Sequence, residues 1–178
     1  ADIYHENDGT LTIVLNADVI PTKSHNFSFL KNCIAVITIA KVLDIELTTI
    51  INQIQSFKTP PGRCQVKQIE DVTVIDDTYN ANLTSSLAAL EYLSAFSGNG
   101  KKIFVFGDMR ELGSSSNEQH TRIGEKCSEL DINIVYTIGK ETKHTDSAIK
   151  KGLNHKHFQS KKRLIESIKD ILCLGDKI

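Results

Sequence analysis

The sequence predicts an α/β fold, in which a mostly parallel sheet is flanked by helices and follows a short α+β segment. From about residue 60 onward, apolar runs with strand character alternate with stretches of helical periodicity, which is typical of a parallel sheet with crossover helices. Residues 1–59 show no such alternation. Two adjacent prolines and a glycine separate the two parts, and these residues cannot lie inside a helix or a central strand.

The first part contains one predicted strand and two predicted helices. Residues Thr10–Leu15 alternate in hydrophobicity like a half-buried strand, residues 26–43 are apolar enough for a mostly buried helix, and a second helix is predicted over residues 46–57. Residues 59–62 are predicted to be a linker, so we expect a domain boundary between residues 59 and 60. The first part is too small for a sandwich or a barrel, and we expect it to be the end of a larger domain.

The second part supplies the strands of the parallel sheet. They are predicted at Val72–Ile75, Ile103–Phe106, Ile134–Ile138 and near His157. Residues 66–69 are expected to pair with the first of these strands across a turn at residues 70 and 71. Helices are predicted over residues 83–93 and 164–171 from apolar spacing, and from a capping-box pattern at Ser116 and Gln119 to about residue 130. A new apolar run begins at Ile178, so we expect another strand there and a chain that is cut at both ends.

Composition argues against several classes of function. The 21 Lys and Arg residues balance the 22 Asp and Glu residues, so no general field favours nucleic acid or an acidic membrane surface. Four dispersed cysteines without a CxxC pair favour a reduced, cytoplasmic protein. The longest apolar run, Cys33–Ala40, is too short to cross a bilayer. We therefore expect a cytoplasmic protein that neither binds nucleic acid nor inserts into a membrane.

Polar side chains follow the first predicted strand of the sheet, at the edge where open α/β sheets bind ligands. Asp76 and Asp77 come directly after the strand, and Asn80 and Asn82 lie where the next helix begins. Carboxylates in this position accept hydrogen bonds from ribose hydroxyls or hold Mg²⁺, and a helix N-terminus favours anions. The alternative is that Asp77 and Asn82 only cap a turn and a helix. The pattern supports both interpretations about equally.

A second charged loop, Gly107–Gly113, follows the next predicted strand. It contains Asp108, Arg110 and Glu111, and the last two either face a ligand or pair with each other. The glycine-rich sequence SGNGKK at Ser97–Lys102 is not a phosphate-binding P-loop, because that motif is GxxxxGK followed by Ser or Thr, between a strand and a helix. No P-loop occurs in the chain.

Three stretches together resemble the Mur ligase family. They are PGR at Pro61–Arg63, VIDDTYNANLTSSLAAL at Val74–Leu90 and FVFGDMRELGSSSNEQH at Phe104–His120. The resemblance extends from about residue 24 to the end of the chain and points to the branch that acts with D-alanyl-D-alanine in peptidoglycan synthesis. It implies a Rossmann-like domain at residues 60–178, preceded at residues 1–59 by the C-terminal remnant of a central ATP-binding domain.

The resemblance also implies an activity. Family members use ATP and Mg²⁺ to activate a substrate carboxylate as an acyl phosphate, which an amine then attacks. The implied substrates are UDP-N-acetylmuramoyl-tripeptide and D-alanyl-D-alanine. This chain has no P-loop and lacks the lysine and the acidic metal ligands of the central domain, so nothing in it clamps the charge on a transferring phosphoryl group. We expect these 178 residues alone not to catalyse ligation.

Individual residues match positions of the family motifs. On the nucleotide side, the resemblance assigns His25, Asn26, Arg63, Asp77 and Asn80. Within this set, the histidine and the first asparagine match the adenine side, the arginine reaches ATP and the carboxylate holds the ribose. On the side of the incoming dipeptide, the resemblance assigns Asn82, Asp108, Arg110 and Glu111. It assigns no catalytic residue and no metal ligand to this part of the enzyme.

A different class of function, a phosphoacceptor receiver domain, also fits some residues. Residues 66–178 have a suitable length, Asp76 and Asp77 would form its acidic pair, and Asp108 would accept the phosphoryl group. Lys140 would be the basic residue after the third strand. This interpretation leaves the PGR sequence, the asparagine-rich loop and the first 60 residues unexplained.

Overall fold

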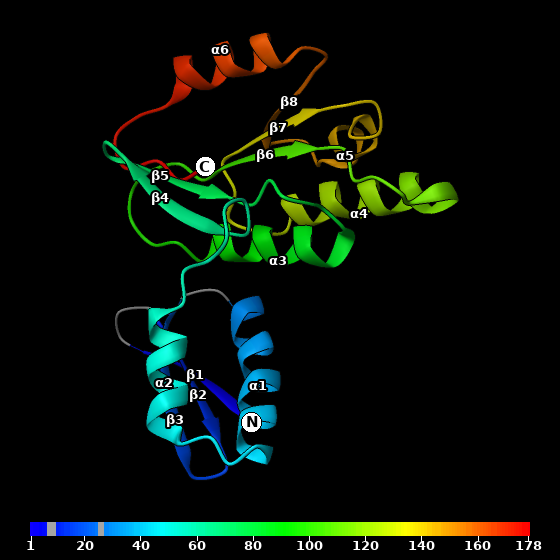
Figure 1. Ribbon diagram of the computed structural model, residues 1–178. Coiled ribbons are helices and arrows are strands. Elements are labelled where there is room, and N and C mark those ends of the chain that lie inside the picture. The colour runs from blue at the N-terminus through cyan, green and yellow to red at the C-terminus, as the bar shows by residue number, and fades with distance from the viewer. Residues whose placement is uncertain (7–9, 25–26) are drawn as a thin grey trace. The chain divides into compact units, whose positions relative to one another are not determined.

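The computed structural model describes residues 1–6, 10–24 and 27–178 (Figure 1). The chain divides into two compact units, Ala1–Thr59 and Pro60–Ile178, at the proline-glycine segment. Within the described ranges, no helix is both long and apolar enough to cross a membrane. Each unit has its own hydrophobic core, and each is described separately below.

The first unit is a three-stranded antiparallel sheet covered by two helices. Its elements are β1 (Asp2–His5), β2 (Leu11–Leu15), β3 (Asp18–Ser24), α1 (Phe27–Val42) and α2 (Leu47–Ser56). The predicted strand and both predicted helices are confirmed, whereas β1 and β3 were not predicted. The core forms where Ile13 and Ile20 of the sheet meet Leu30 and Ile37 of α1, all four of which are fully buried.

The second unit contains the predicted alternation of strands and helices. Its elements are β4 (Gln65–Ile69), β5 (Val72–Asp76), α3 (Leu83–Ser94), β6 (Ile103–Gly107), a short 3₁₀ turn (Gly113–Ser115), α4 (Ser116–Cys127), β7 (Ile134–Ile138), α5 (Lys143–Ala148), β8 (Asn154–Phe158) and α6 (Lys161–Ile171). Strands β6, β7 and β8 are parallel, while β4 and β5 form an antiparallel hairpin through the turn at residues 70 and 71. The α/β fold and the predicted strands are therefore confirmed.

Residues 176–178 join the hairpin to the parallel strands. Lys177 forms parallel bridges with Thr73 of β5 and with Lys102, the residue that precedes β6. On either side of this segment, Thr73 N–H donates to Asp176 O and Ile103 N–H donates to Lys177 O, at 2.9 and 2.8 Å. The order across the sheet is thus β4, β5, residues 176–178, β6, β7 and β8. Lys177 makes only isolated bridges, next to Ile178, where the sequence predicts a strand.

Helices cover both faces of the parallel sheet (Figure 1). Successive residues of β6 and β7 point to opposite faces, so Phe104 and Val135 pack with residues of α3 and α4, whereas Ile103 and Ile134 pack with Leu164 of α6. Sheets buried on both faces have nearly continuous apolar strands. This explains why the sequences IFVFG and IVYTI were recognisable as strands.

The start of α4 differs from the prediction, whereas the start of α3 agrees with it. The capping box expected at Ser116 and Gln119 is wrong: the N-cap of α4 is Ser115, which makes no capping hydrogen bond, and the Ser116 hydroxyl donates to Glu141 instead. A true capping box opens α3, where Asn82 accepts from Ser85 N–H and the Ser85 hydroxyl accepts from Asn82 N–H. Helix α4 also ends at residue 127 rather than near 130.

The close packing of α4 on α5 predicts that replacing Gly124 by alanine destabilises the protein, although the same change stabilises most helices. Alanine normally stabilises a helix interior by about 1 kcal/mol relative to glycine. A Cβ added at Gly124 would lie 2.2 Å from Thr145 O and 2.9 Å from Ala148 Cβ. We therefore expect Gly124→Ala to lower the free energy of unfolding by about 1–3 kcal/mol, measured by urea denaturation.

The matched control for this substitution is Glu125→Ala, on the exposed face of the same helix. It is expected to change the free energy of unfolding by less than about 0.5 kcal/mol. A Gly124→Ala protein as stable as the wild type would contradict the close approach of the two helices.

Candidate functional site

The functional candidates of the second unit lie at one edge of the sheet. Strands β5, β6 and β7 are parallel, so their carboxyl ends and the loops that follow them share this edge. The loop after β5 and the loop after β6 are separated by two strand spacings, or about 10 Å. This is the edge at which open α/β sheets bind ligands.

The PGR sequence and the loop after β5 contact each other directly. Tyr79 N–H donates to Gly62 O at 2.9 Å, and Cys64 N–H donates to Asp77 Oδ1 at 2.9 Å. The guanidinium of Arg63 stacks over the ring of Tyr79, 3.9 Å from its centroid. Gly62 has φ +73°, and a Cβ there would lie 3.1 Å from Tyr79 N. The fold therefore brings together two of the predicted nucleotide-side residues, Arg63 and Asp77.

The two adjacent carboxylates have different environments. Asp76 accepts from Lys67 Nζ across the hairpin at 2.6 Å and from the Thr78 hydroxyl at 2.7 Å, and the bond from Lys67 holds the pKa of Asp76 below its usual value. Burial raises the pKa of Asp77, although the Cys64 hydrogen bond and the Arg63 charge act in the opposite direction. Within the described chain, the Asp77 carboxylate accepts a hydrogen bond only at Oδ1. Its Oδ2 can therefore accept a ligand hydroxyl.

The two asparagines of the loop are used locally. Asn80 is exposed, and its Oδ1 accepts from Ala81 N–H at 2.9 Å. Asn82 Oδ1 caps α3, so only its Nδ2 donors stay open to a ligand. The expectation that Asn82 caps a helix is confirmed, which does not test its role toward a substrate. The other predicted nucleotide-side residues, His25 and Asn26, lie outside the described residues.

Asp108 anchors the loop after β7 to the loop after β6. Its Oδ2 accepts from Lys140 N–H at 2.8 Å, and its Oδ1 accepts from the N–H groups of Glu141 and Thr142, both at 2.9 Å. Burial alone would raise the pKa of Asp108, but these three hydrogen bonds outweigh it and hold the pKa below its usual value. The anchor also requires glycine at 139, because a Cβ there would lie 2.1 Å from Asp108 Oδ1.

A buried histidine holds the middle of the Gly107–Gly113 loop. His120 is fully buried, its Nε2 accepts from Met109 N–H at 3.1 Å, and its Nδ1 lies 2.8 Å from Ser116 O. This pattern assigns a neutral ring with the proton on Nδ1. With Asp108 and Met109 both fixed, the next two side chains, Arg110 and Glu111, are exposed. Ion pairs between Arg110 and Glu111 are absent from the described part of the chain.

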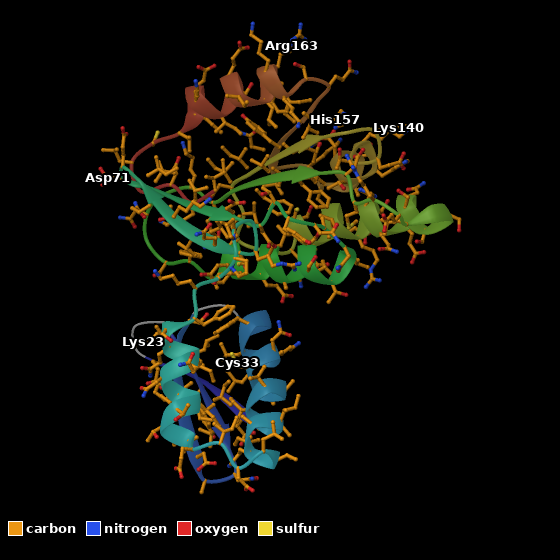
Figure 2. All side chains as sticks on the ribbon, in the orientation of Figure 1. Lys23, Cys33, Asp71, Lys140, His157 and Arg163 are labelled. Atoms are coloured by element: carbon orange, nitrogen blue, oxygen red, sulfur yellow. The ribbon has the colours of Figure 1, made fainter. Side chains whose placement is uncertain are left out.

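A surface pocket of about 620 Å³ lies at this edge. It is lined by residues 107–113, Ser116, Ile138, Gly139, Glu141 and Lys161. Its wall therefore contains three of the predicted substrate-side residues, Asp108, Arg110 and Glu111. The Lys140 side chain is not part of the wall; Figure 2 shows this residue in the loop after β7.

Sequence reasoning missed Glu141, Lys161 and Ser116 of this pocket. The signal was present, because Gly139–Glu141 follows β7 in the same way as Gly107–Asp108 follows β6, and Lys161 follows β8. Applying the sheet-edge rule to the third and fourth strands would have found them. Groups of three or more His, Cys, Asp or Glu side chains placed to hold a metal ion are absent among the described residues.

The Asp108 anchor predicts a pH-dependent stability. Its pKa is below the ordinary value of 3.8 in the folded state, so its stabilisation is fully present above that pH and is lost as the pH falls through the lowered pKa. We expect Asp108→Asn to lower the free energy of unfolding by about 1–3 kcal/mol at neutral pH. Urea denaturation should show this difference from the wild type shrinking at acidic pH. Asp170→Asn, on exposed α6, is the control, and a difference for Asp108→Asn that does not change with pH would contradict the anchor.

Comparisons with known proteins are consistent with this geometry. The chain is 37% identical over 155 residues to the UDP-N-acetylmuramoyl-tripeptide--D-alanyl-D-alanine ligase of Buchnera aphidicola subsp. Baizongia pistaciae, covering 86% of the chain and 32% of that protein. It is 31% identical over 150 residues to the ligase of the same name from Escherichia coli, covering 84% and 31%. The chain therefore spans about one third of the length of these curated relatives.

Solved structures share the fold of nearly the whole chain. The crystal structure of MurF from Acinetobacter baumannii matches with a TM-score of 0.84 and 25% identity, over 99% of this chain and 39% of that one. MurF from Thermotoga maritima, in complex with ADP, matches with a TM-score of 0.80 and 26% identity, over 99% and 40%. The family described as Mur ligase, glutamate ligase domain, matches residues 62–178. The chain accordingly belongs to the Mur ligase family.

Proposed function

We propose that the chain is the C-terminal part of an ATP-dependent ligase that adds D-alanyl-D-alanine to UDP-N-acetylmuramoyl-tripeptide. The observation that carries this proposal is the contact of the PGR sequence with the Asp77 loop, since the hydrogen bond from Tyr79 N–H to Gly62 O joins the two family motifs. The names of the relatives support the substrates, and the ADP complex of a structural neighbour supports the nucleotide. On this proposal, residues 1–59 are the end of the central ATP-binding domain, and the enzyme is cytoplasmic.

The proposed contribution of the second unit to nucleotide binding rests on Asp77 and Arg63. Asp77 Oδ2 is an acceptor for a ribose hydroxyl, and partial burial strengthens such a hydrogen bond by excluding water. Arg63 is exposed, with its guanidinium held in place by the Tyr79 ring, and its charge suits a phosphate group. ATP and Mg²⁺ would supply the activation of the substrate carboxylate. This chain alone, without a P-loop, is proposed to be inactive.

The alternative of a phosphoacceptor receiver domain is disfavoured. Both oxygens of Asp108 accept hydrogen bonds from backbone N–H groups, which makes them weaker nucleophiles toward a phosphoryl donor. Asp76 forms an ion pair with Lys67. The family match and the similar solved structures also favour the ligase.

The nucleotide role of Asp77 can be tested in the longer ligase that contains this chain. Asp77→Ala is expected to raise the apparent KM for ATP by roughly tenfold or more, because it removes a charged hydrogen-bond acceptor. Steady-state kinetics with varied ATP measure this. The control is Asp71→Ala, in the turn at the opposite end of β5 (Figure 2), which should leave the KM unchanged. A KM for ATP that Asp77→Ala does not alter would remove this residue from the nucleotide site.

A further inference from the structure

Arg63 and Asp77 carry opposite charges and lie near each other without pairing. Burial raises the pKa of Asp77 and the Arg63 charge opposes this rise, so the two groups are within electrostatic range of each other. In the part of the chain that the structure describes, their side chains nevertheless share neither an ion pair nor a hydrogen bond. Because opposite charges attract, another contact is needed to hold the guanidinium where it is.

The ring of Tyr79 provides that contact. The Arg63 guanidinium lies over the ring, 3.9 Å from its centroid, which is within the range of a cation–π interaction. The tyrosine is 67% exposed, and its hydroxyl makes no hydrogen bond within the described ranges. A side chain this exposed contributes little to the hydrophobic core. The position of the ring therefore serves the stack with Arg63 rather than the packing of the second unit.

Backbone hydrogen bonds place the arginine and the tyrosine side by side. Tyr79 N–H donates to Gly62 O, and Cys64 N–H donates to Asp77 Oδ1, both at 2.9 Å. Residues 62 and 64, on either side of Arg63, are thereby tied to the loop after β5. Both donors are main-chain groups. Replacing the Tyr79 side chain therefore leaves these two hydrogen bonds in place and removes only the ring beneath the guanidinium.

We propose that Tyr79 is a positioning residue, which holds the Arg63 guanidinium away from Asp77 and so keeps both side chains open to one ligand. With the guanidinium stacked, Asp77 Oδ2 stays an acceptor for a hydroxyl group, and the N–H groups of Arg63 stay donors for a phosphate group. A ligand that carries both groups is a nucleotide, and this assignment rests on the proposed function. Tyr79 acts through Arg63 and not through a contact of its own with the nucleotide.

The first test measures the pKa of Asp77 in the 178-residue chain, by an NMR titration of its ¹³C-labelled carboxyl group. In Tyr79→Leu the guanidinium is released to pair with Asp77, so we expect the pKa of this carboxyl to fall below that of the wild type. Tyr79→Phe keeps an aromatic face and should match the wild type. The neighbouring Asp76 and its partner Lys67 are the same in all three proteins, so the difference reports the movement of Arg63.

The second test measures steady-state kinetics of the longer ligase that contains this chain. Tyr79→Leu should raise the KM for ATP by roughly two- to fivefold, the value of one exposed cation–π interaction, while kcat and the KM for D-alanyl-D-alanine stay unchanged. Tyr79→Phe is the matched control and should behave as the wild type. In an Arg63→Gln background, Tyr79→Leu should have no further effect, because the group that it positions is absent.

The two tests separate this inference from the proposed function. An Asp77 pKa that is the same in Tyr79→Leu and in the wild type would overturn the positioning role, and so would a KM for ATP that Tyr79→Phe raises as much as Tyr79→Leu does. Failure of the longer enzyme to ligate D-alanyl-D-alanine with ATP would overturn the proposed function. The carboxyl titration requires neither nucleotide nor ligation, so it decides whether Tyr79 holds Arg63 apart from Asp77 in either case.

Discussion

The backbone pairing of residues 176–178 between β5 and β6 is the constraint on which the second unit depends. Without it, the hairpin that carries Asp77 and the parallel strands that carry the pocket would be separate sheets. The segment is fixed by Asp176, whose carboxylate is almost fully buried and accepts from the N–H groups of Lys101 and Cys173, with the Lys101 ammonium 3.3 Å away. A buried carboxylate costs free energy unless it is hydrogen-bonded in this way. The Asp77 loop and the pocket therefore keep a fixed spacing because of a polar interaction at the opposite end of the strands.

Four aspartates illustrate how similar residues divide into structural and ligand-facing roles. Asp76, Asp108 and Asp176 are each satisfied by protein donors, from a lysine side chain in the first case and mainly from backbone N–H groups in the other two. Asp77 retains an oxygen without a partner in the described chain, and burial raises its pKa. The number of donors around each carboxylate, rather than its position in a motif, distinguishes the ligand candidate from the scaffold.

The fold was largely predictable because strands buried on both faces, such as IFVFG, carry an unmistakable apolar signal. The edge strands β1 and β3 were missed, since β1 has only four residues and β3 contains a proline and a lysine. The site was predictable as an edge of the sheet, but not residue by residue. Asp76 pairs with Lys67 because of the register of the hairpin. Asp108 reaches residues 140–142 because β6 pairs in parallel with β7. The local sequence determines neither register.

The Asp108 anchor has a consequence for how this protein can change. All three of its hydrogen bonds end on main-chain N–H groups, which every residue except proline possesses. The side chains at positions 140 and 141 can therefore be exchanged while the turn keeps its shape. The shape of the pocket and the charge of its wall are thus controlled by different atoms, so a substitution at Glu141 could change that charge without rebuilding the loop.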